Sequence, residues 1–354
     1  MQSGISPRLK EFLEALQQEG LNTYYQATLG KGKYKPVFTP TPSPLTLPHK
    51  WDYERAKTKL YQLSELLSPE ESERVNVQFE NPGLREYIPA ATTSTMRAGI
   101  QLLKPGWKAP SHRHTANAIR FVLEAKEGGY TIVDGVKIPM KPGDLIITPN
   151  WLWHEHGNEG VFDVIWLDVL DAIFTYWIGA VFYTTLPERW QGVRNDASLN
   201  QAQFGRGVSP TAEVPGGRLL YYPFKDAEAA LQAQGRREWS VVRYINPRTG
   251  GDATDTMAFR MVMVKEGGVT PNFRRTENLI LNVFMGVGRV VLPERKVEFK
   301  VRPHDVVAIP SWEPYYLSNE GKESLYVFVA SDEPLFRAAG FFREEKGGEG
   351  GEKS

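Results

Sequence analysis

The sequence contains no cysteine, and this absence limits the kinds of site that it can form. Without cysteine there are neither disulfide bonds nor thiolate metal ligands, so any bound metal must be held by His, Asp, Glu or backbone oxygen. Histidine is also scarce, with six residues among 354. Two of the six, His112 and His114, are one residue apart, and this spacing raises the question of whether they are metal ligands.

An excess of charge of one sign is also missing. The 42 basic residues equal the 42 acidic residues in number, and no run of lysine or arginine stands out. Neither a nucleic acid nor a polybasic membrane contact is therefore indicated. A protein that acts on small molecules fits this composition better, and the absence of cysteine is compatible with a cytoplasmic location.

Long apolar runs are missing as well. Residues 1–20 lack the apolar core of a signal peptide and instead predict a helix at about residues 6–19, with Ser6 as its N-cap and Pro7 in its first turn. The most apolar run, residues 172–186, is shorter than the roughly 20 residues that span a bilayer. We expect it to form a buried strand-to-loop segment or a subunit contact, and no membrane partner is expected.

What the sequence does contain is an internal repeat. A shift of 161 positions sets 146-IITPNWLWHEHGNEG-160 over 307-VAIPSWEPYYLSNEG-321 without a gap, and the same shift aligns 141-KPGD-144 with 302-RPHD-305. Such a constant register predicts two copies of one domain. Each copy consists of short alternating apolar runs separated by Gly, Pro and Asp turns, which is typical of an antiparallel sandwich or barrel.

We therefore expect a mostly β protein with two antiparallel β-barrel domains and peripheral helices. The expected divisions are an N-terminal helical and Pro-rich segment (1–90), a first barrel (91–185), a linker with a short helix (186–250), a second barrel (251–340) and a disordered tail (341–354). Helices outside the repeats are predicted near residues 52–66 and 226–234, the latter opened by Asp226.

The two copies differ at the positions that could carry chemistry. The shift aligns each of three histidines with another residue type, namely His112 with Phe273, His114 with Arg275 and His154 with Tyr315. Because residues two apart on a strand share a face, His112 and His114 can point into one barrel interior, where His154 could complete a three-nitrogen metal site. Such a set leaves coordination positions open, as in Fe(II) oxygenases. The alternative is that these histidines are ordinary polar residues.

The spacing around these histidines matches a known pattern. Gly106, five residues and His112-Arg-His114, followed later by Gly143, five residues, Pro149 and then His154, resemble the two cupin motifs. The glutamate that many cupins place after the second histidine is missing, and Trp151 stands where glycine is common. Together with HRHT, an arginine at position 120 and the string WLWHEHGN, these departures are similar to the gentisate 1,2-dioxygenase family of bicupins.

This resemblance implies an activity and a cofactor. It implies Fe(II), molecular oxygen and cleavage of a salicylate-type aromatic ring between its carboxyl-bearing and hydroxyl-bearing carbons. The substrates of the family include gentisate, salicylate, 5-nitrosalicylate and 1-hydroxy-2-naphthoate. The resemblance also implies a homotetramer whose second, degenerate cupin domain is structural. Three neutral imidazoles would leave the charge of iron uncompensated, which favours a dianionic chelate such as a 2-hydroxybenzoate.

Four further residues are candidates for the site. Arg120 lies six residues after His114, so on an unbroken strand it would face the interior, where it could clamp a carboxylate or orient oxygen; the alternative is an ion pair at the barrel rim. Gln101 and Asp168 match family positions near the iron, although ordinary buried hydrogen bonding would also explain them. A buried Asp168 needs a partner such as His156 or a ligand histidine. His156 itself is either an acid–base group beside the metal or a hydrogen-bonded loop residue.

Arg97 is a departure that bears on the substrate. It stands where the family has an aromatic residue, and it shares a strand face with Gln101. We hypothesise that Arg97 reaches the substrate and favours an additional polar or anionic ring substituent, the alternative being that its side chain extends to the rim.

Two other classes of function remain open from the sequence. A cupin metal site can serve a non-oxidative enzyme, such as an isomerase or a decarboxylase. A non-catalytic ligand-binding bicupin is the other alternative, but the retention of the histidines in one copy and their loss in the other argue against it.

Overall fold

The structure is a computed structural model that describes residues 6–23, 38–67, 74–205, 217–235 and 237–346. The chain forms two compact units, Met1–Ser43 and Pro44–Ser354. In the first unit, helix α1 (Pro7–Gln18) begins after Ser6, whose hydroxyl accepts a hydrogen bond from the amide of Leu9 at 3.3 Å. The predicted N-terminal helix and its cap are thus confirmed.

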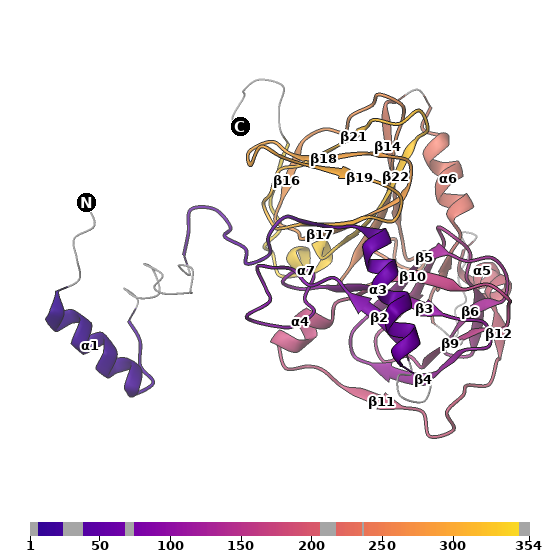
Figure 1. Ribbon diagram of the computed structural model, residues 1–354, viewed down its shortest axis with the longest axis horizontal. Coiled ribbons are helices and arrows are strands. Elements are labelled where there is room, and N and C mark those ends of the chain that lie inside the picture. Colours follow the sequence, from indigo (N-terminus) through magenta and orange to yellow (C-terminus); the bar gives the residue numbers. More distant parts are fainter. Residues whose placement is uncertain (1–5, 24–37, 68–73, 206–216, 236, 347–354) are drawn as a thin grey trace. The chain divides into compact units, whose positions relative to one another are not determined.

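The second unit contains two β-barrels, drawn in purple to pink and in orange to yellow in Figure 1. Two six-stranded sheets form the first barrel, with the strand orders β13-β8-β5-β10-β3-β2 and β11-β4-β9-β6-β7-β12. Its strands are β2 (Val75–Gln78), β3 (Arg97–Leu103), β4 (Lys108–His114), β5 (Ala118–Glu124), β6 (Gly129–Val133), β7 (Val136–Pro139), β8 (Leu145–Thr148), β9 (His154–Asn158), β10 (Val164–Leu170), β11 (Tyr183–Thr185), β12 (Asn195–Asp196) and β13 (Tyr221–Tyr222).

The second barrel repeats this plan. Its six-stranded sheet has the order β1-β20-β17-β22-β15-β14, and the sheets β19-β18-β21 and β16-β23 complete it. Its strands are β1 (His49–Trp51), β14 (Trp239–Tyr244), β15 (Ala258–Val264), β16 (Phe273–Arg275), β17 (Leu279–Met285), β18 (Gly288–Leu292), β19 (Val297–Val301), β20 (Val306–Ile309), β21 (Tyr316–Asn319), β22 (Leu325–Ser331) and β23 (Glu344–Lys346). The mostly β architecture with two barrels is confirmed, and β23 lies within the segment 341–354 that the sequence predicts to be disordered.

Short helices accompany the barrels. They are α3 (Tyr53–Leu66), α4 (Ala172–Trp177), α5 (Ala197–Phe204), α6 (Phe224–Gln232) and α7 (Glu333–Ala338). Helix α3 agrees with the prediction, whereas α6 begins two residues before Asp226, because Pro223 occupies the N-cap position. Among the described residues, no helix combines the length and the apolar character needed to cross a membrane.

The segment before the first barrel adds an edge strand and a helix to the second barrel, and the segment before the second barrel adds an edge strand and a helix to the first. Strand β1 pairs with β20 of the second barrel, and β13 pairs with β8 of the first. The helix after each strand begins against an aspartate of that barrel, because the Tyr53 amide donates to Asp305 and the Phe224 amide donates to Asp144, both at 2.9 Å. The 161-residue shift aligns Asp144 with Asp305, so the predicted N-terminal segment and linker both contribute strands to the repeat.

A second reciprocal contact joins the two barrels. The Thr95 hydroxyl of the first barrel donates to Asp332 of the second at 2.6 Å, and the Thr256 hydroxyl of the second donates to Asp171 of the first. Between them lies a shared apolar core in which the rings of Phe121 and Phe328 stack at 4.2 Å. This exchange fixes the barrels against each other and leaves the far end of the first barrel for a site.

Two turn positions explain unusual residues of the repeat. Gly143 has a φ of 83°, and His304, which replaces it in the second copy, has a φ of 69°. Trp151, which stands where cupins commonly have glycine, has a φ of 62°. These values lie in the left-handed region that favours glycine. The motif glycine and the two residues that stand in glycine positions therefore adopt the same kind of backbone conformation.

The apolar run 172–186 does not form the buried strand segment that was one expectation. Its first half is helix α4, and its second half leads to the edge strand β11. Trp177 and Phe182 are 50% and 64% exposed. The run is therefore a surface segment, which leaves the other expectation, a subunit contact.

Candidate functional site

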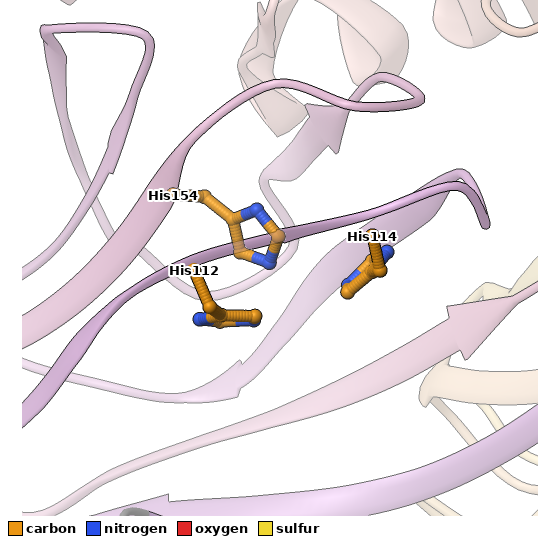
Figure 2. Close-up of side chains that lie close together, drawn as sticks. All are labelled: His112, His114 and His154. Atoms are coloured by element: carbon orange, nitrogen blue, oxygen red, sulfur yellow. The ribbon is translucent and has the colours of Figure 1, made fainter. Parts of the chain in front are cut away.

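Three histidines of the first barrel converge, as Figure 2 shows. Strand β4 supplies His112 and His114, and strand β9 supplies His154. The two strands are antiparallel neighbours, with His112 directly opposite His154 and a register irregularity between Ala109 and His112. Each ring offers one nitrogen, and these atoms all lie within 4.8 Å of one another.

The backbone determines which ring nitrogen is available. The Nδ1 atom of each histidine lies next to a carbonyl oxygen two residues away, Pro110 for His112 (3.1 Å), Ala116 for His114 (2.8 Å) and Leu152 for His154 (3.0 Å). A carbonyl only accepts, so Nδ1 carries the proton and Nε2 keeps its lone pair. The Nε2 atom of His154 is buried without a hydrogen-bond partner in the described part of the chain. A metal ion would satisfy this atom, so the three residues fit a metal.

The electrostatic environment keeps these rings neutral. Burial, assisted by the charge of Arg74, lowers the pKa of His112 to about 2. Burial also lowers the pKa of His114 to about 4 and that of His154 well below its ordinary value. Since metal binding requires neutral imidazole, these side chains need lose no proton at pH 7 before they coordinate.

Arg74, just before β2, is a site residue that the sequence reasoning missed. Its Nη2 atom contacts both ring nitrogens of His112. Because Nδ1 of His112 donates to Pro110, the nitrogen that accepts from Arg74 is Nε2. Arg74 and a metal ion therefore compete for the same lone pair, so metal binding requires the guanidinium to move away from it. Arg74 lies outside the predicted barrel, and no motif in the sequence marks it.

Arg120 lies in the interior and not at the barrel rim. It is 3% exposed, it donates to the Thr148 hydroxyl, and its Nε is 3.8 Å from Asp168 Oδ1. The two residues face each other across β5 and β10. Burial lowers the pKa of Arg120 to about 10, which still leaves it charged at pH 7. Asp168 also accepts a hydrogen bond from Trp166 Nε1 at 2.9 Å, so its partners are Arg120 and Trp166 in place of the expected histidine.

His156 and Gln101 are also buried. His156 Nδ1 lies 2.9 Å from the Thr131 hydroxyl, and its ring centroid is 6.1 Å from that of His154. Burial lowers the pKa of His156 well below its ordinary value, so the ring is neutral. Gln101 Nε2 is buried and has no hydrogen-bond partner among the described residues. An unpaired buried donor of this kind is costly unless a ligand or water accepts from it.

Arg97 begins strand β3 on the same face as Gln101. Its Nε atom is buried and has no hydrogen-bond partner in the described part of the chain. Burial lowers the pKa of Arg97. The side chain is therefore half-buried with donor capacity to spare, which agrees with a position near the interior better than with extension into solvent.

Comparisons with known proteins place the chain. A family model described as a cupin domain matches residues 99–170, which hold the three histidines. The chain is 36% identical over 312 residues to a gentisate 1,2-dioxygenase from Ralstonia sp., and the match covers 85% of each chain. The chain belongs to the gentisate 1,2-dioxygenase family. The bicupin resemblance drawn from the motifs is thus confirmed, and the protein is a ring-cleaving dioxygenase of this family.

Other members of the family extend the comparison. The chain is 34% identical over 312 residues to a 1-hydroxy-2-naphthoate 1,2-dioxygenase from Nocardioides sp. (strain KP7), covering 86% of this chain and 80% of that one. A salicylate 1,2-dioxygenase from Pseudaminobacter salicylatoxidans has the same fold, with a TM-score of 0.86 and 28% identity, and the match covers 97% of this chain and 99% of that one. The named substrates of these relatives are all aromatic 2-hydroxy acids.

Proposed function

We propose that the protein is an Fe(II)-dependent dioxygenase that cleaves a salicylate-type 2-hydroxybenzoate between its carboxyl-bearing and hydroxyl-bearing carbons. The observation that carries this proposal is the convergence of three neutral imidazoles whose Nε2 atoms keep their lone pairs, in a member of the gentisate 1,2-dioxygenase family. Gentisate, salicylate, 5-nitrosalicylate and 1-hydroxy-2-naphthoate are the substrates to consider.

His112, His114 and His154 are the proposed iron ligands. Three nitrogen ligands leave open positions for the substrate and for oxygen, as in other non-haem Fe(II) oxygenases. Bound Fe(II) would supply a Lewis acid that holds both reactants and the electrons with which oxygen is activated. Because the protein ligands carry no charge, the site favours a substrate that binds through carboxylate and phenolate oxygens.

Arginines are the proposed partners of the substrate carboxylate and of oxygen. Arg120 is held in one orientation by Thr148 and Asp168, and its Nε has no hydrogen-bond partner among the described residues. Arg74 already reaches the histidine cluster, and a carboxylate bound there would offer it a new acceptor when metal displaces it from His112.

Gln101, His156, Asp168 and Arg97 complete the proposed site. The free Nε2 donor of Gln101 is suited to a ring hydroxyl, and the neutral ring of His156 can relay a proton between the substrate and Thr131. Asp168 orients Arg120. Arg97 is proposed to favour a polar or anionic ring substituent.

The assembly is proposed to be a homotetramer. The exposed apolar segment around α4 and β11 supports a subunit contact, because contiguous exposed apolar surface commonly marks an interface. The cytoplasmic location expected from the sequence stays a prediction.

The proposal is tested by anaerobic reconstitution with Fe(II), followed by oxygen-electrode and ultraviolet measurements with the four substrates. We expect one equivalent of oxygen to be consumed per substrate lost, together with the absorbance of a ring-opened dienoic acid. His112→Ala should lose both iron and turnover. Bound iron without oxygen uptake on any substrate would contradict the proposal and favour a non-oxidative cupin enzyme.

A further inference from the structure

The second barrel contains a cavity that the proposed reaction does not use. Its volume is about 150 Å³, and its walls come from β14, β15, β16, β21, β22 and the residues next to them. The lining residues are Trp239, Val241, Arg260, Val262, Thr270, Phe273, Arg275, Tyr315, Leu317 and Val329. Leu317 and Val329 are buried, whereas the other lining side chains are partly exposed, so small molecules can reach the cavity.

This cavity occupies the place of the metal site in the other copy. The 161-residue shift aligns its lining with the candidate site of the first barrel, Val262 with Gln101, Phe273 with His112, Arg275 with His114, Tyr315 with His154, Leu317 with His156 and Val329 with Asp168. The pairing of β14 with β15 also sets Val241 opposite Val262, as the pairing of β2 with β3 sets Asn76 opposite Gln101. At these aligned positions the second copy has a cavity and no histidine.

The replacements exclude a metal and favour an aromatic ring. The lining contains no histidine and no carboxylate, so the ligands that a metal would need are missing. Trp239 and Phe273 form an edge-to-face pair with centroids 6.4 Å apart, and valine and leucine supply four of the other eight lining residues. A cavity of about 150 Å³ with apolar walls accommodates a single benzene ring in another protein. The space suits one six-membered ring and is too small for two fused rings.

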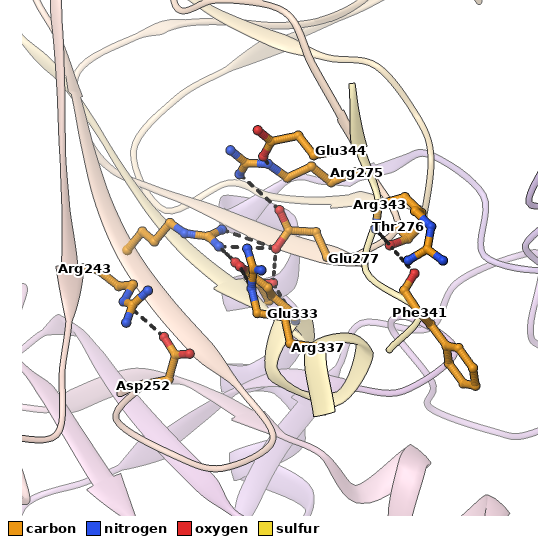
Figure 3. A network of polar contacts seen from close by, with 12 residues as sticks. Arg243, Asp252, Arg275, Thr276, Glu277, Glu333, Arg337, Phe341, Arg343 and Glu344 are labelled. Carbon is orange, nitrogen blue, oxygen red and sulfur yellow. Dashed lines mark hydrogen bonds and ion pairs between the residues drawn. The ribbon is translucent and has the colours of Figure 1, made fainter. Parts of the chain in front are cut away.

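The polar groups of the lining point to a carboxylate on that ring. Arg260 and Arg275 line the cavity, and both are tied to the buried Glu277, which does not line it. Figure 3 shows Arg275 and Glu277 in the network that continues to Glu333 and Arg337. Glu277 therefore pairs with the two arginines from outside the cavity lining, and the charged groups that line the cavity itself are cationic.

Donors for a carboxylate remain available. Arg275 uses Nε for Glu344 and Nη1 for Glu277 at 3.2 Å, and its Nη2 makes no hydrogen bond to another described residue. The Tyr315 hydroxyl likewise has no hydrogen-bond partner among the described residues, although burial raises the pKa of Tyr315 to about 12 and so keeps its proton in place. A protonated hydroxyl beside a guanidinium is a suitable pair of donors for a carboxylate.

We propose that the second barrel binds a monocyclic aromatic carboxylate of the benzoate class in this cavity, without metal and without turnover. The ring packs against the walls formed by Trp239 and Phe273, and the carboxylate faces Arg275 and Tyr315. The barrel that lacks the three aligned histidines then recognises a ring carboxylate of the kind that the other barrel is proposed to cleave. This inference does not depend on the proposed reaction, because it requires neither iron nor oxygen.

The experiment is a ¹⁹F NMR titration of the iron-free full-length His112→Ala protein with 4-fluorobenzoate, which lacks the hydroxyl of the proposed substrates. We expect saturable binding of one probe per chain, and competition by benzoate but not by 2-naphthoate. Tyr315→Phe, which keeps the ring and removes only the hydroxyl, should weaken binding about tenfold. Val262→Phe, which fills the cavity, should abolish binding.

A matched variant in the first barrel separates the two sites. Gln101→Leu should leave probe binding unchanged, because Gln101 is the first-barrel counterpart of Val262. The proposal is overturned if the probe does not bind, if 2-naphthoate competes as well as benzoate, or if the folded Tyr315→Phe and Val262→Phe proteins bind as tightly as the parent. Failure of oxygen uptake by the iron-loaded enzyme would leave this binding result unaffected, so the two proposals fail independently.

Discussion

Arg113 lies between the two histidines of β4 and faces the opposite side of the strand. Its guanidinium carbon lies 4.4 Å from the ring centroids of both Trp151 and Trp153, so the side chain is sandwiched between two indoles. Because Trp153 directly precedes His154, this sandwich ties the strand of two proposed ligands to the start of the strand of the third. Arg113 thus positions the proposed ligands from the opposite side of the strand and does not face the histidine cluster.

Loss of this sandwich should loosen the metal site. We predict that Arg113→Met weakens Fe(II) binding about tenfold, because changes in residues that orient metal ligands typically cost 10- to 100-fold in affinity. Arg113→Lys keeps the charge but not the planar stacking and should lie between the two. Anaerobic competition with a chromophoric chelator measures the affinities. Equal affinity of Arg113→Met and the parent, both folded, would refute the positioning role.

The substrate preference is argued at Arg97. Its half-buried guanidinium retains an unpaired Nε donor on the face that it shares with Gln101. We predict that Arg97→Tyr lowers kcat/KM for a substrate with a polar ring substituent, such as gentisate, by about tenfold relative to salicylate. Steady-state oxygen uptake on the substrate panel measures the ratio. An unchanged ranking of substrates would mean that Arg97 does not contact the ring substituent.

At the level of the secondary-structure elements, the contact between the two barrels contains a residue with a shifted pKa, Asp332. Asp332 accepts hydrogen bonds from Thr95 of the other barrel at 2.6 Å and from the Asn278 side chain at 2.8 Å. Burial nevertheless raises the pKa of Asp332 to about 7, from an ordinary value of 3.8. Between these two values the folded protein holds a proton that the unfolded chain has released, so this group makes the free energy of unfolding fall as the pH rises from about 4 to 7.

Asp332→Asn should remove that contribution. The parent should lose free energy of unfolding when the pH is raised from 5 to 8, and the variant should not. We predict that the difference between the two changes is about 1 kcal/mol or more. Urea denaturation at the two pH values measures the difference. Thr95→Val is the matched control. The hydrogen bond from Thr95 lowers the pKa of Asp332, so its loss should move the titration to higher pH. Parallel pH dependence of the parent and Asp332→Asn would contradict the assignment.

Much of this architecture can be predicted from the sequence. The parts that cannot be predicted all have the same physical reason. The constant register predicts two barrels, and the i, i+2 spacing predicts that His112 and His114 share a face. The exchange of β1 and β13 between the barrels cannot be predicted from the sequence, because local patterns do not specify which distant edge a strand joins. The same limit hides Arg74 and the pairing of Asp168 with Arg120, since both depend on the register between strands.

The helix α4 shows another limit of the sequence. An apolar run signals burial, but whether the burying surface belongs to the same chain or to another copy is not encoded locally. In the structure, this run lies on the surface of the second unit. The sequence of one chain therefore does not decide whether this run is covered by a partner.

For the whole molecule, the exposed apolar surface around α4 and β11 lies next to a strand that carries two of the proposed metal ligands. Its large side chains are at least half exposed, namely Tyr176, Trp177, Ile178, Val181, Phe182 and Tyr183. Strand β11 pairs with β4, and the ring of Tyr183 stacks on that of His112 with centroids 5.7 Å apart. A partner subunit that covers this surface would therefore also fix the strand beside the proposed metal ligands.

This arrangement predicts that assembly and iron binding are coupled. The double variant Ile178→Asp/Phe182→Asp should lower the mass in sedimentation velocity from that of a tetramer, because each charge would be buried unpaired in the contact. It should also weaken Fe(II) binding several-fold, because β11 loses its cover. Val161→Asp, at a residue that is 80% exposed in the turn before β10, is the matched control and should change neither. A double variant that keeps the parent's mass would place the subunit contact elsewhere, whereas a smaller assembly with unchanged iron affinity would show that β4 holds its ligands without help from a neighbour.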